Sequence, residues 1–324
     1  MNAAVTTILD AIGNTPLVRL SKLETPGCAK IWGKAEFMNP AASIKDRPAL
    51  WMINEAEKQG RLTPGATIVE ATAGNTGLGL AMIAAVKGYK LKIVMPDKMS
   101  QEKINMIKAF GAEVVVTRSD VASDHPDYYH NVARSIAAST PGSLLADQFN
   151  NQANIRSHYE STGPEIWEQL GKRVDCFVAG AGTGGTVTGV GKFLKEKSDG
   201  KTRIVGVEPV GSLYSELAAG DKNGKGTAYK VEGIGNDKQL GCLDFSVIDA
   251  WVKVSDTDSF ATARDLVRKE GLFVGGSAGS NVWAAIQESK KLSADSNVVT
   301  ILCDSADRYI SKIFNDDWMK ENGF

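Results

Sequence analysis

The chain has 324 residues, of which 43% are hydrophobic and 23% charged, a composition typical of a globular protein with one large or two ordinary domains. Its 37 Lys and Arg residues balance 38 Asp and Glu residues, so no basic excess exists to neutralise a nucleic-acid backbone. No apolar run reaches the ~20 residues that a membrane helix needs, and the N-terminus lacks the pattern of a secretory signal.

Short apolar, β-branched runs alternate with segments of helical periodicity. In chain order the predicted elements are helix 46–59, strand 67–69, helix 76–87, strand 91–95, helix 101–110, strand 113–117, helix 164–170, strand 176–179, helix 187–197, strand 204–207, helix 259–269, helix 280–292 and strand 298–302. This alternation predicts mostly parallel sheets covered by helices on both faces. Several strands end in glycine-rich turns, where ligands bind in such folds, so we expect one site built from several turns.

The first motif, residues 39–47 (NPAASIKDR), places Lys45 directly before a predicted helix and among small residues. Most lysines are exposed, so a solvated amine is the simpler interpretation of the local context. The alternative is an amine whose pKa is lowered by nearby helix amides, so that it can form an imine. The local context leaves both interpretations open.

The second motif, residues 180–186 (GAGTGGT), lies between a predicted strand and a predicted helix. Its glycines let backbone amides approach an anion and the helix start adds partial positive charge, so we expect a phosphate here. The motif also satisfies the GxGxxG pattern of dinucleotide folds, with Glu208 as the acidic residue for a ribose. Thr183 and Thr186 add hydroxyl donors that suit a terminal phosphate better than a pyrophosphate. A nicotinamide-dependent oxidoreductase stays open as a remote alternative.

Residues 275–279 (GGSAG) match the GxSxG pattern of serine hydrolases. No histidine follows Ser277, because the last one is His158, so this class is excluded and Ser277 is predicted to cap a helix. The four cysteines and three histidines lack the spacing of a disulfide framework or a metal site. We therefore expect no metal and a reducing, cytoplasmic location.

Three motifs in this order carry a family resemblance: the Lys45 motif, the loop 71–77 (ATAGNTG) and the cup at 182–186. Together they resemble the cysteine synthase and cystathionine β-synthase family of fold type II pyridoxal-phosphate enzymes. The resemblance covers nearly the whole chain, from residues 12–17 (IGNTPL) to the tail around Trp318.

The resemblance implies a fold like that of the tryptophan synthase β subunit, with two three-layer α/β domains and the cofactor, pyridoxal 5′-phosphate, in the cleft between them. A smaller, mobile domain of residues 36–147 would carry the loop for the substrate carboxylate. A larger domain of residues 1–35 together with 148–324 would carry the phosphate cup.

The resemblance also implies roles for matching positions. Lys45 would carry the cofactor as an internal aldimine and act as the catalytic base, Asn75 would bind the 3′-oxygen of the ring, and Ser305 would face the pyridine nitrogen. The positions implied to bind the cofactor are Lys45, Asn75, Gly182, Thr183, Gly184, Gly185, Thr186 and Ser305. Those implied to bind the substrate are Thr72, Ala73, Gly74, Asn75, Thr76, Gln148 and Gly233. Ala73 replaces a serine common in this loop, which removes one hydroxyl donor.

The implied reaction is β-replacement on a serine-type amino acid through an aminoacrylate. O-acetylserine and sulfide would make the protein a cysteine synthase, whereas serine or O-acetylserine with homocysteine would make it a cystathionine β-synthase. Residues 232–235 (EGIG) and 315–319 (NDDWM) resemble the latter enzymes, but Asn236 stands where they usually have tyrosine. Single-module relatives often use O-acetylserine, so the resemblance favours cysteine synthase. The resemblance also implies a homodimer that binds an amino acid and a sulfur nucleophile. As the composition indicates, nucleic acid and membrane are not expected as partners.

Overall fold

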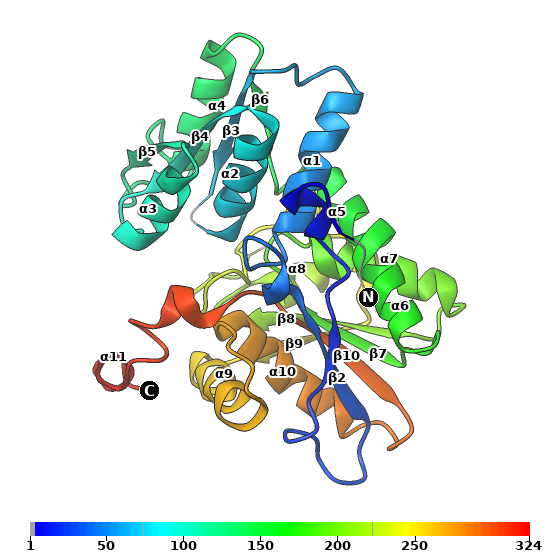
Figure 1. Cartoon of the computed structure of the whole chain (residues 1–324). Coiled ribbons are helices and arrows are strands. Elements are labelled where there is room, and N and C mark those ends of the chain that lie inside the picture. Colours follow the sequence, from blue (N-terminus) through cyan, green and yellow to red (C-terminus); the bar gives the residue numbers. More distant parts are fainter. Residues whose placement is uncertain (1–3, 73, 222) are drawn as a thin grey trace. The chain divides into compact units, whose positions relative to one another are not determined.

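A computed structural model describes residues 4–72, 74–221 and 223–324, and Figure 1 labels its elements. The chain divides into two units. The first unit comprises Met1–Ile12 and Asn39–Asn154, and the second comprises Gly13–Met38 and Ile155–Phe324. Ala73, one of the predicted substrate residues, lies outside the described residues.

The first unit is built on a four-stranded parallel sheet with the strand order β5-β4-β3-β6. The strands are β3 (Thr67–Ala71), β4 (Lys90–Pro96), β5 (Glu113–Thr117) and β6 (Leu144–Leu145). The helices are η1 (Ile8–Ala11), α1 (Asp46–Lys58), α2 (Asn75–Lys87), α3 (Gln101–Ala109), α4 (Tyr129–Ser139) and α5 (Ala153–Ser157), the last at the passage to the second unit.

Helices cover both faces of this sheet because successive residues of a strand point to opposite sides. On β3, Ile68 packs with Ile53 of α1 and Leu80 of α2. Its neighbour Val69 packs instead with Ala133 of α4. The first unit therefore has three layers, as the alternation of apolar strands and helices predicts.

The second unit contains a six-stranded sheet with the order β1-β2-β10-β7-β8-β9. Strand β1 pairs with β2 in antiparallel fashion, and the other neighbouring pairs are parallel. The strands are β1 (Leu17–Arg19), β2 (Lys30–Ala35), β7 (Cys176–Gly180), β8 (Arg203–Pro209), β9 (Ala250–Val254) and β10 (Asn297–Leu302). The helices are η2 (Glu36–Met38), the π-helix η3 (His158–Thr162), α6 (Gly163–Gln169), α7 (Gly185–Lys197), α8 (Tyr214–Ala218), η4 (Phe245–Val247), α9 (Asp256–Glu270), α10 (Gly276–Ser289), η5 (Ala306–Tyr309) and α11 (Asp316–Glu321).

Figure 1 shows α9 and α10 on one side of the second sheet and α6 and α7 on the other. The apolar core on the α10 side joins Val282 and Ala285 to Val178 of β7 and Val298 of β10. Three-layer packing of this kind leaves the carboxyl ends of the parallel strands as the edge where loops can gather around a ligand.

The predicted fold class is confirmed. The six predicted strands and seven predicted helices are present, with bounds that differ by at most four residues. The prediction that Ser277 caps a helix is wrong, because α10 begins at Gly276 and its N-cap, Gly275, has no side chain to donate or accept. Within the described ranges, none of the helices combines the length and apolar character that crossing a bilayer requires.

Candidate active site

Lys45 occupies the N-cap position of α1, directly before the helix, where the sequence predicts it. Its backbone amide donates to Ser43 Oγ (3.2 Å) and its carbonyl accepts the Ala49 amide (3.0 Å). Helix α1 lies against α2 at Gly79, where a Cβ atom would be 3.4 Å from the Cα of Asp46. The half-buried Lys45 is therefore held beside the first turns of α2.

The turn before Lys45 contains a strained residue. Ala42 has a φ of 58°, in the left-handed region that costs a residue other than glycine about 1–2 kcal/mol. Two hydrogen bonds hold the turn: the Ala42 amide donates to the Asn39 carbonyl (2.7 Å), and the Ala41 amide donates to Asp46 Oδ2 (2.6 Å). Backbone strain that is fixed in this way concentrates at functional sites.

The predicted substrate residues of the first unit gather at the carboxyl end of its sheet. Thr72 and Gly74 follow β3, while Asn75 and Thr76 begin α2. Strand β6 is the parallel neighbour of β3, so Gln148, which follows β6, shares this edge. The Thr76 hydroxyl donates to Gln148 Oε1 (2.5 Å). Because the Oε1 atom of Gln148 accepts this bond, its NH2 group points the other way. An NH2 group donates hydrogen bonds, as the recognition of a carboxylate requires.

Glu70, which the sequence analysis did not single out, directly precedes this loop on β3. Its side chain is 1% exposed, and its Oε2 atom has no hydrogen-bond partner among the described residues. Burial, with a smaller contribution from the Asp147 charge, raises the pKa of Glu70 to about 8 despite opposing hydrogen bonds from Gln148 and Asp147. This shift favours the neutral acid form of Glu70, at the end of β3 that leads into the substrate loop.

The predicted phosphate cup, residues 182–186, lies between β7 and α7 as the sequence predicts. Gly184 is the N-cap of α7, with a φ of 88° that favours glycine, and the helix begins at Gly185. Thr183 and Thr186 are 6% and 9% exposed, so their hydroxyls lie in a nearly closed environment. Thr183 Oγ1 accepts the Gly185 amide (3.3 Å), which orients this hydroxyl at the helix start.

A second segment closes on the cup. A Cβ atom on Gly182 would lie 2.2 Å from the Gly233 carbonyl oxygen, so the close approach of these two backbones requires glycine at position 182. The Gly235 amide donates to the Ala181 carbonyl (2.7 Å) and fixes this approach. The predicted substrate residue Gly233 thus lies directly beside the cup.

His158, which the sequence analysis assigned no role, contacts the cup from the π-helix η3. Its Nε2 lies 3.2 Å from Thr186 Oγ1 and its Nδ1 lies 2.9 Å from Thr162 Oγ1. All three side chains are buried. An imidazole with a partner at each nitrogen fixes the position of Thr186 Oγ1, and π-helical turns occur frequently at functional sites. Its position in the sequence carries no motif that reveals this contact.

Ser305 follows β10, whose parallel neighbour β7 leads into the cup, so both lie at the carboxyl edge of the second sheet. Ser305 is the N-cap of η5 but makes no side-chain capping bond there. Asn281 joins the two strand ends, because its Oδ1 accepts the Gly180 amide (2.7 Å) and its NH2 group donates to the Ile301 carbonyl (2.8 Å). These two hydrogen bonds fix the spacing between the end of β7, which leads into the cup, and the end of β10, which leads to Ser305.

Glu208, the acidic residue of the alternative dinucleotide interpretation, is engaged by backbone amides of its own chain. Glu208 is fully buried, and its two oxygens accept the backbone amides of Tyr214 (2.7 Å) and Ser215 (2.9 Å). Both carboxylate oxygens therefore accept hydrogen bonds from amides at the start of α8. The dinucleotide interpretation loses the acidic residue on which it depended.

Each unit contributes a set of groups whose chemistry fits a different part of pyridoxal phosphate. The first unit supplies a lysine amine for the aldehyde beside a loop with donors for a carboxylate. The second supplies hydroxyls and amides at a helix start for a phosphate dianion, and a hydroxyl for a ring nitrogen. In the part of the chain that the structure describes, no cluster of three or more His, Cys, Asp or Glu side chains could hold a metal ion.

Known proteins agree with this donor set. The model of the family described as "Pyridoxal-phosphate dependent enzyme" matches residues 8–304. The cystathionine β-synthase of Mus musculus is 46% identical over 98% of this chain, which spans 56% of that protein. Cysteine synthase 1 of Neurospora crassa is 44% identical over 96% of this chain and 84% of that protein. This chain thus spans about half the length of the mouse relative.

A solved structure adds evidence for the fold. The crystal structure of a hydrogen sulfide-producing enzyme from Fusobacterium nucleatum matches with a TM-score of 0.87 and 38% identity, over 94% of this chain and 100% of that chain. The predicted cofactor, pyridoxal 5′-phosphate, is confirmed by the family match. The chain belongs to the pyridoxal-phosphate-dependent enzymes of fold type II, in the group that contains cystathionine β-synthases and cysteine synthases.

Proposed function

We propose that this protein catalyses β-replacement on O-acetylserine, with sulfide as the nucleophile and L-cysteine and acetate as products. The observation that carries the proposal is Lys45, a half-buried amine at the start of α1, beside a loop whose donors suit an amino-acid carboxylate. We further propose that Lys45 of the first unit and the cup of the second unit bind the same cofactor molecule.

Pyridoxal phosphate supplies an electron sink that stabilises negative charge at Cα of an amino acid. In this proposal the Thr183 and Thr186 hydroxyls and the amides at the start of α7 bind its phosphate. Asn75 binds the 3′-oxygen and Ser305 the pyridine nitrogen. Because a neutral hydroxyl does not hold a proton on that nitrogen, Ser305 favours loss of the β-substituent over transamination.

Lys45 has two duties in the proposed reaction. Its Nζ atom would hold the cofactor through the aldehyde group in the absence of substrate. As a free amine it would take the proton from Cα when acetate leaves Cβ, and it would return that proton to Cα after a thiolate has added to Cβ. Thr72, the backbone amide of Thr76 and the NH2 group of Gln148 would bind the substrate carboxylate throughout, which would fix Cα against the amine.

Two side chains near the cup favour sulfide over homocysteine. Homocysteine is a zwitterion, whose recognition requires polar groups for a second ammonium and a second carboxylate, whereas sulfide requires none. On the segment beside the cup, Glu232 forms an ion pair with Lys312 (2.6 Å), and Asn236 Oδ1 accepts the amides of Asp237 (2.9 Å) and Lys238 (3.3 Å). The Glu232 carboxylate and the Asn236 Oδ1 atom are therefore already engaged within the chain.

The test is a product assay with each donor and each nucleophile. Purified protein is given O-acetylserine or serine with sulfide or homocysteine, and acetate, cysteine and cystathionine are quantified. We expect rapid release of acetate and cysteine from O-acetylserine and sulfide. Lys45→Ala should abolish turnover and the visible absorbance of bound cofactor, while Lys58→Ala, an exposed position on the same helix, should change neither. Full turnover by Lys45→Ala would overturn the assignment.

A cystathionine β-synthase activity is the second candidate, since relatives with that name are 42–46% identical to this chain. In the same assay, rapid cystathionine formation with little cysteine would replace the preferred substrate pair. A homodimer and a cytoplasmic location stay predictions, which sedimentation and cell fractionation can test.

A further inference from the structure

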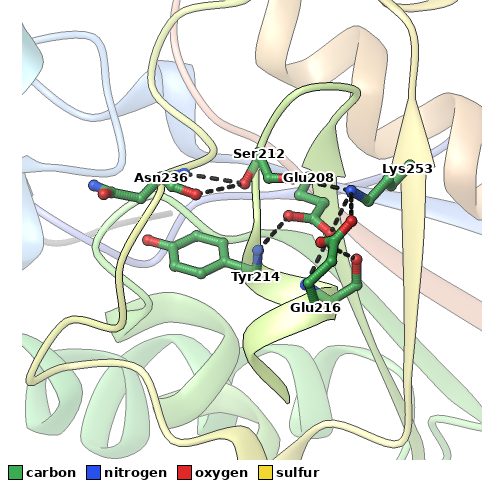
Figure 2. Close-up of polar contacts among 7 residues, drawn as sticks. Glu208, Ser212, Tyr214, Glu216, Asn236 and Lys253 are labelled. Carbon is green, nitrogen blue, oxygen red and sulfur yellow. Dashed lines mark hydrogen bonds and ion pairs between the residues drawn. The ribbon is translucent and has the colours of Figure 1, made fainter. Parts of the chain in front are cut away.

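The turn between β8 and α8 is fixed by a cluster of the buried Glu208 with the partly exposed Lys253 and Glu216, shown in Figure 2. Glu208 accepts the amides of Tyr214 and Ser215, as described above. The Lys253 amine, on the neighbouring strand β9, lies 3.9 Å from Glu208 Oε1. It also donates to the Ser212 carbonyl (2.9 Å) and to Glu216 (2.5 Å). The backbone that carries Tyr214 is therefore held on both sides by charged groups.

The side chain of Tyr214 reaches from this turn to the cup. Its hydroxyl donates to the Gly182 carbonyl oxygen (2.6 Å), and in Figure 2 its ring points away from the Glu208 carboxylate. The ring is fully buried and lies against Trp251 (5.7 Å between centroids). Burial raises the pKa of the Tyr214 phenol well above its ordinary value, so the hydroxyl remains a donor over the usual pH range.

Peptide geometry converts this bond into an effect on the cup. In a planar trans peptide the carbonyl oxygen of one residue and the amide hydrogen of the next point in opposite directions. When Tyr214 holds the Gly182 oxygen, the Thr183 amide hydrogen must point to the other side of the same peptide plane. Donation to the carbonyl also polarises the peptide and strengthens its N–H as a donor.

We propose that Tyr214 is a positioning residue for the cofactor phosphate, which fixes the Gly182–Thr183 peptide so that the Thr183 amide donates to a phosphate oxygen. The Glu208–Lys253 pair fixes Tyr214 in turn. This proposal rests on the assignment of the cup as the phosphate site.

The test compares pyridoxal 5′-phosphate with pyridoxal, which lacks the phosphate, as ligands of the apoenzyme. Tyr214→Phe keeps the ring and removes only the donor, which leaves a buried carbonyl oxygen without that bond. We expect the variant to bind pyridoxal 5′-phosphate about 5- to 100-fold more weakly. Its affinity for pyridoxal should change less than about 2-fold, because that ligand makes no contact with the amide. The 31P resonance of the bound phosphate should also shift.

The control is Tyr89→Phe, which removes a half-buried hydroxyl that donates to Glu57 (2.7 Å) in the first unit, and should leave both affinities unchanged. Equal losses for the two ligands in Tyr214→Phe, or no loss for either, would overturn the proposal. If that variant does not fold, Lys253→Met, which retains the hydroxyl but loosens the turn, must show the same selective loss. A wild-type apoenzyme that binds pyridoxal as tightly as pyridoxal 5′-phosphate would instead refute the phosphate cup itself.

Discussion

Glu70 is a carboxyl group that the fold removes from water just before the substrate loop. The unfolded chain ionises it near its ordinary pKa of 4.5, whereas the folded protein keeps it protonated up to about pH 8. The folded state binds the extra proton, so this group's contribution to stability is full below pH 4.5 and is lost as the pH rises through 8.

We expect Glu70→Gln to remove this loss, because a neutral amide keeps the shape and one acceptor oxygen. Between pH 5 and pH 8 the stability of the variant relative to wild type should increase by at least about 1 kcal/mol. Urea unfolding at several pH values measures this, with Glu113→Gln, at an exposed position, as the control. Identical pH slopes for wild type and Glu70→Gln would contradict the prediction.

Gly184 and Gly220 share a φ of 88°, but only Gly184 is crowded: a Cβ there would lie 2.6 Å from the Leu243 Cα, whereas none of the described atoms lies within 4 Å at Gly220. Gly220→Ala should therefore cost only the left-handed strain, about 1 kcal/mol. Gly184→Ala should cost at least about 2 kcal/mol more and weaken cofactor binding, because the helix start must shift. Denaturant unfolding and cofactor titration measure both effects, and equal costs would show that crowding is unimportant.

At the scale of single elements, the start of a helix is stabilised when the side chain of the residue before it accepts a hydrogen bond from an amide of the first turn. Ser255 Oγ accepts the Asp258 amide (3.0 Å) at the start of α9, whereas Ser100 Oγ accepts the Lys103 amide at 3.5 Å at the start of α3. The shorter bond satisfies its amide better. We expect Ser255→Ala to cost about 1 kcal/mol of stability and Ser100→Ala less, as measured by thermal unfolding. A larger loss at Ser100 would contradict this ranking.

Elements with strong periodicity were predictable, and elements with weak local signals were not. The strand at 113–117 and the helix that begins at Gln101 agree with the structure because apolar residues and a capping serine mark them. Strand β2 was not predicted because Lys30 and Lys34 interrupt its apolar pattern. Lys34 is buried in an ion pair with Glu165 (2.6 Å), a tertiary contact that local sequence does not reveal.

The positions of the candidate site residues were also predictable only where the local sequence carries a strong signal. Lys45 and residues 182–186 lie at helix starts where glycine and helix-start chemistry, together with the family resemblance, place them, and their roles stay predictions. His158 and Tyr214 were missed because each is an isolated residue that reaches the cup from a distant part of the chain. Glu208 matched a ribose-binding pattern, but the turn that follows it uses both of its oxygens.

For the whole molecule, the proposal that both units bind one cofactor molecule predicts that the cofactor stabilises both units. Ligand binding stabilises a folded state by about 2.7 kcal/mol at a concentration of 100 Kd. We expect removal of pyridoxal phosphate to lower the melting temperature, and its return to slow amide hydrogen exchange at Gly74–Thr76 and at Gly182–Thr186 alike. Slowing confined to one of the two segments would contradict a shared cofactor.

The strand order of the second sheet has a consequence for synthesis on the ribosome. Strand β2, residues Lys30–Ala35, pairs with β10, residues Asn297–Leu302, so β2 cannot complete its pairing until a segment far downstream in the sequence has been translated. The strands of the first unit all lie between Thr67 and Leu145 and can pair much sooner. Until β10 emerges, the nascent chain displays unpaired strand edges, so chains that terminate before residue 297 should be prone to aggregate and to recruit chaperones.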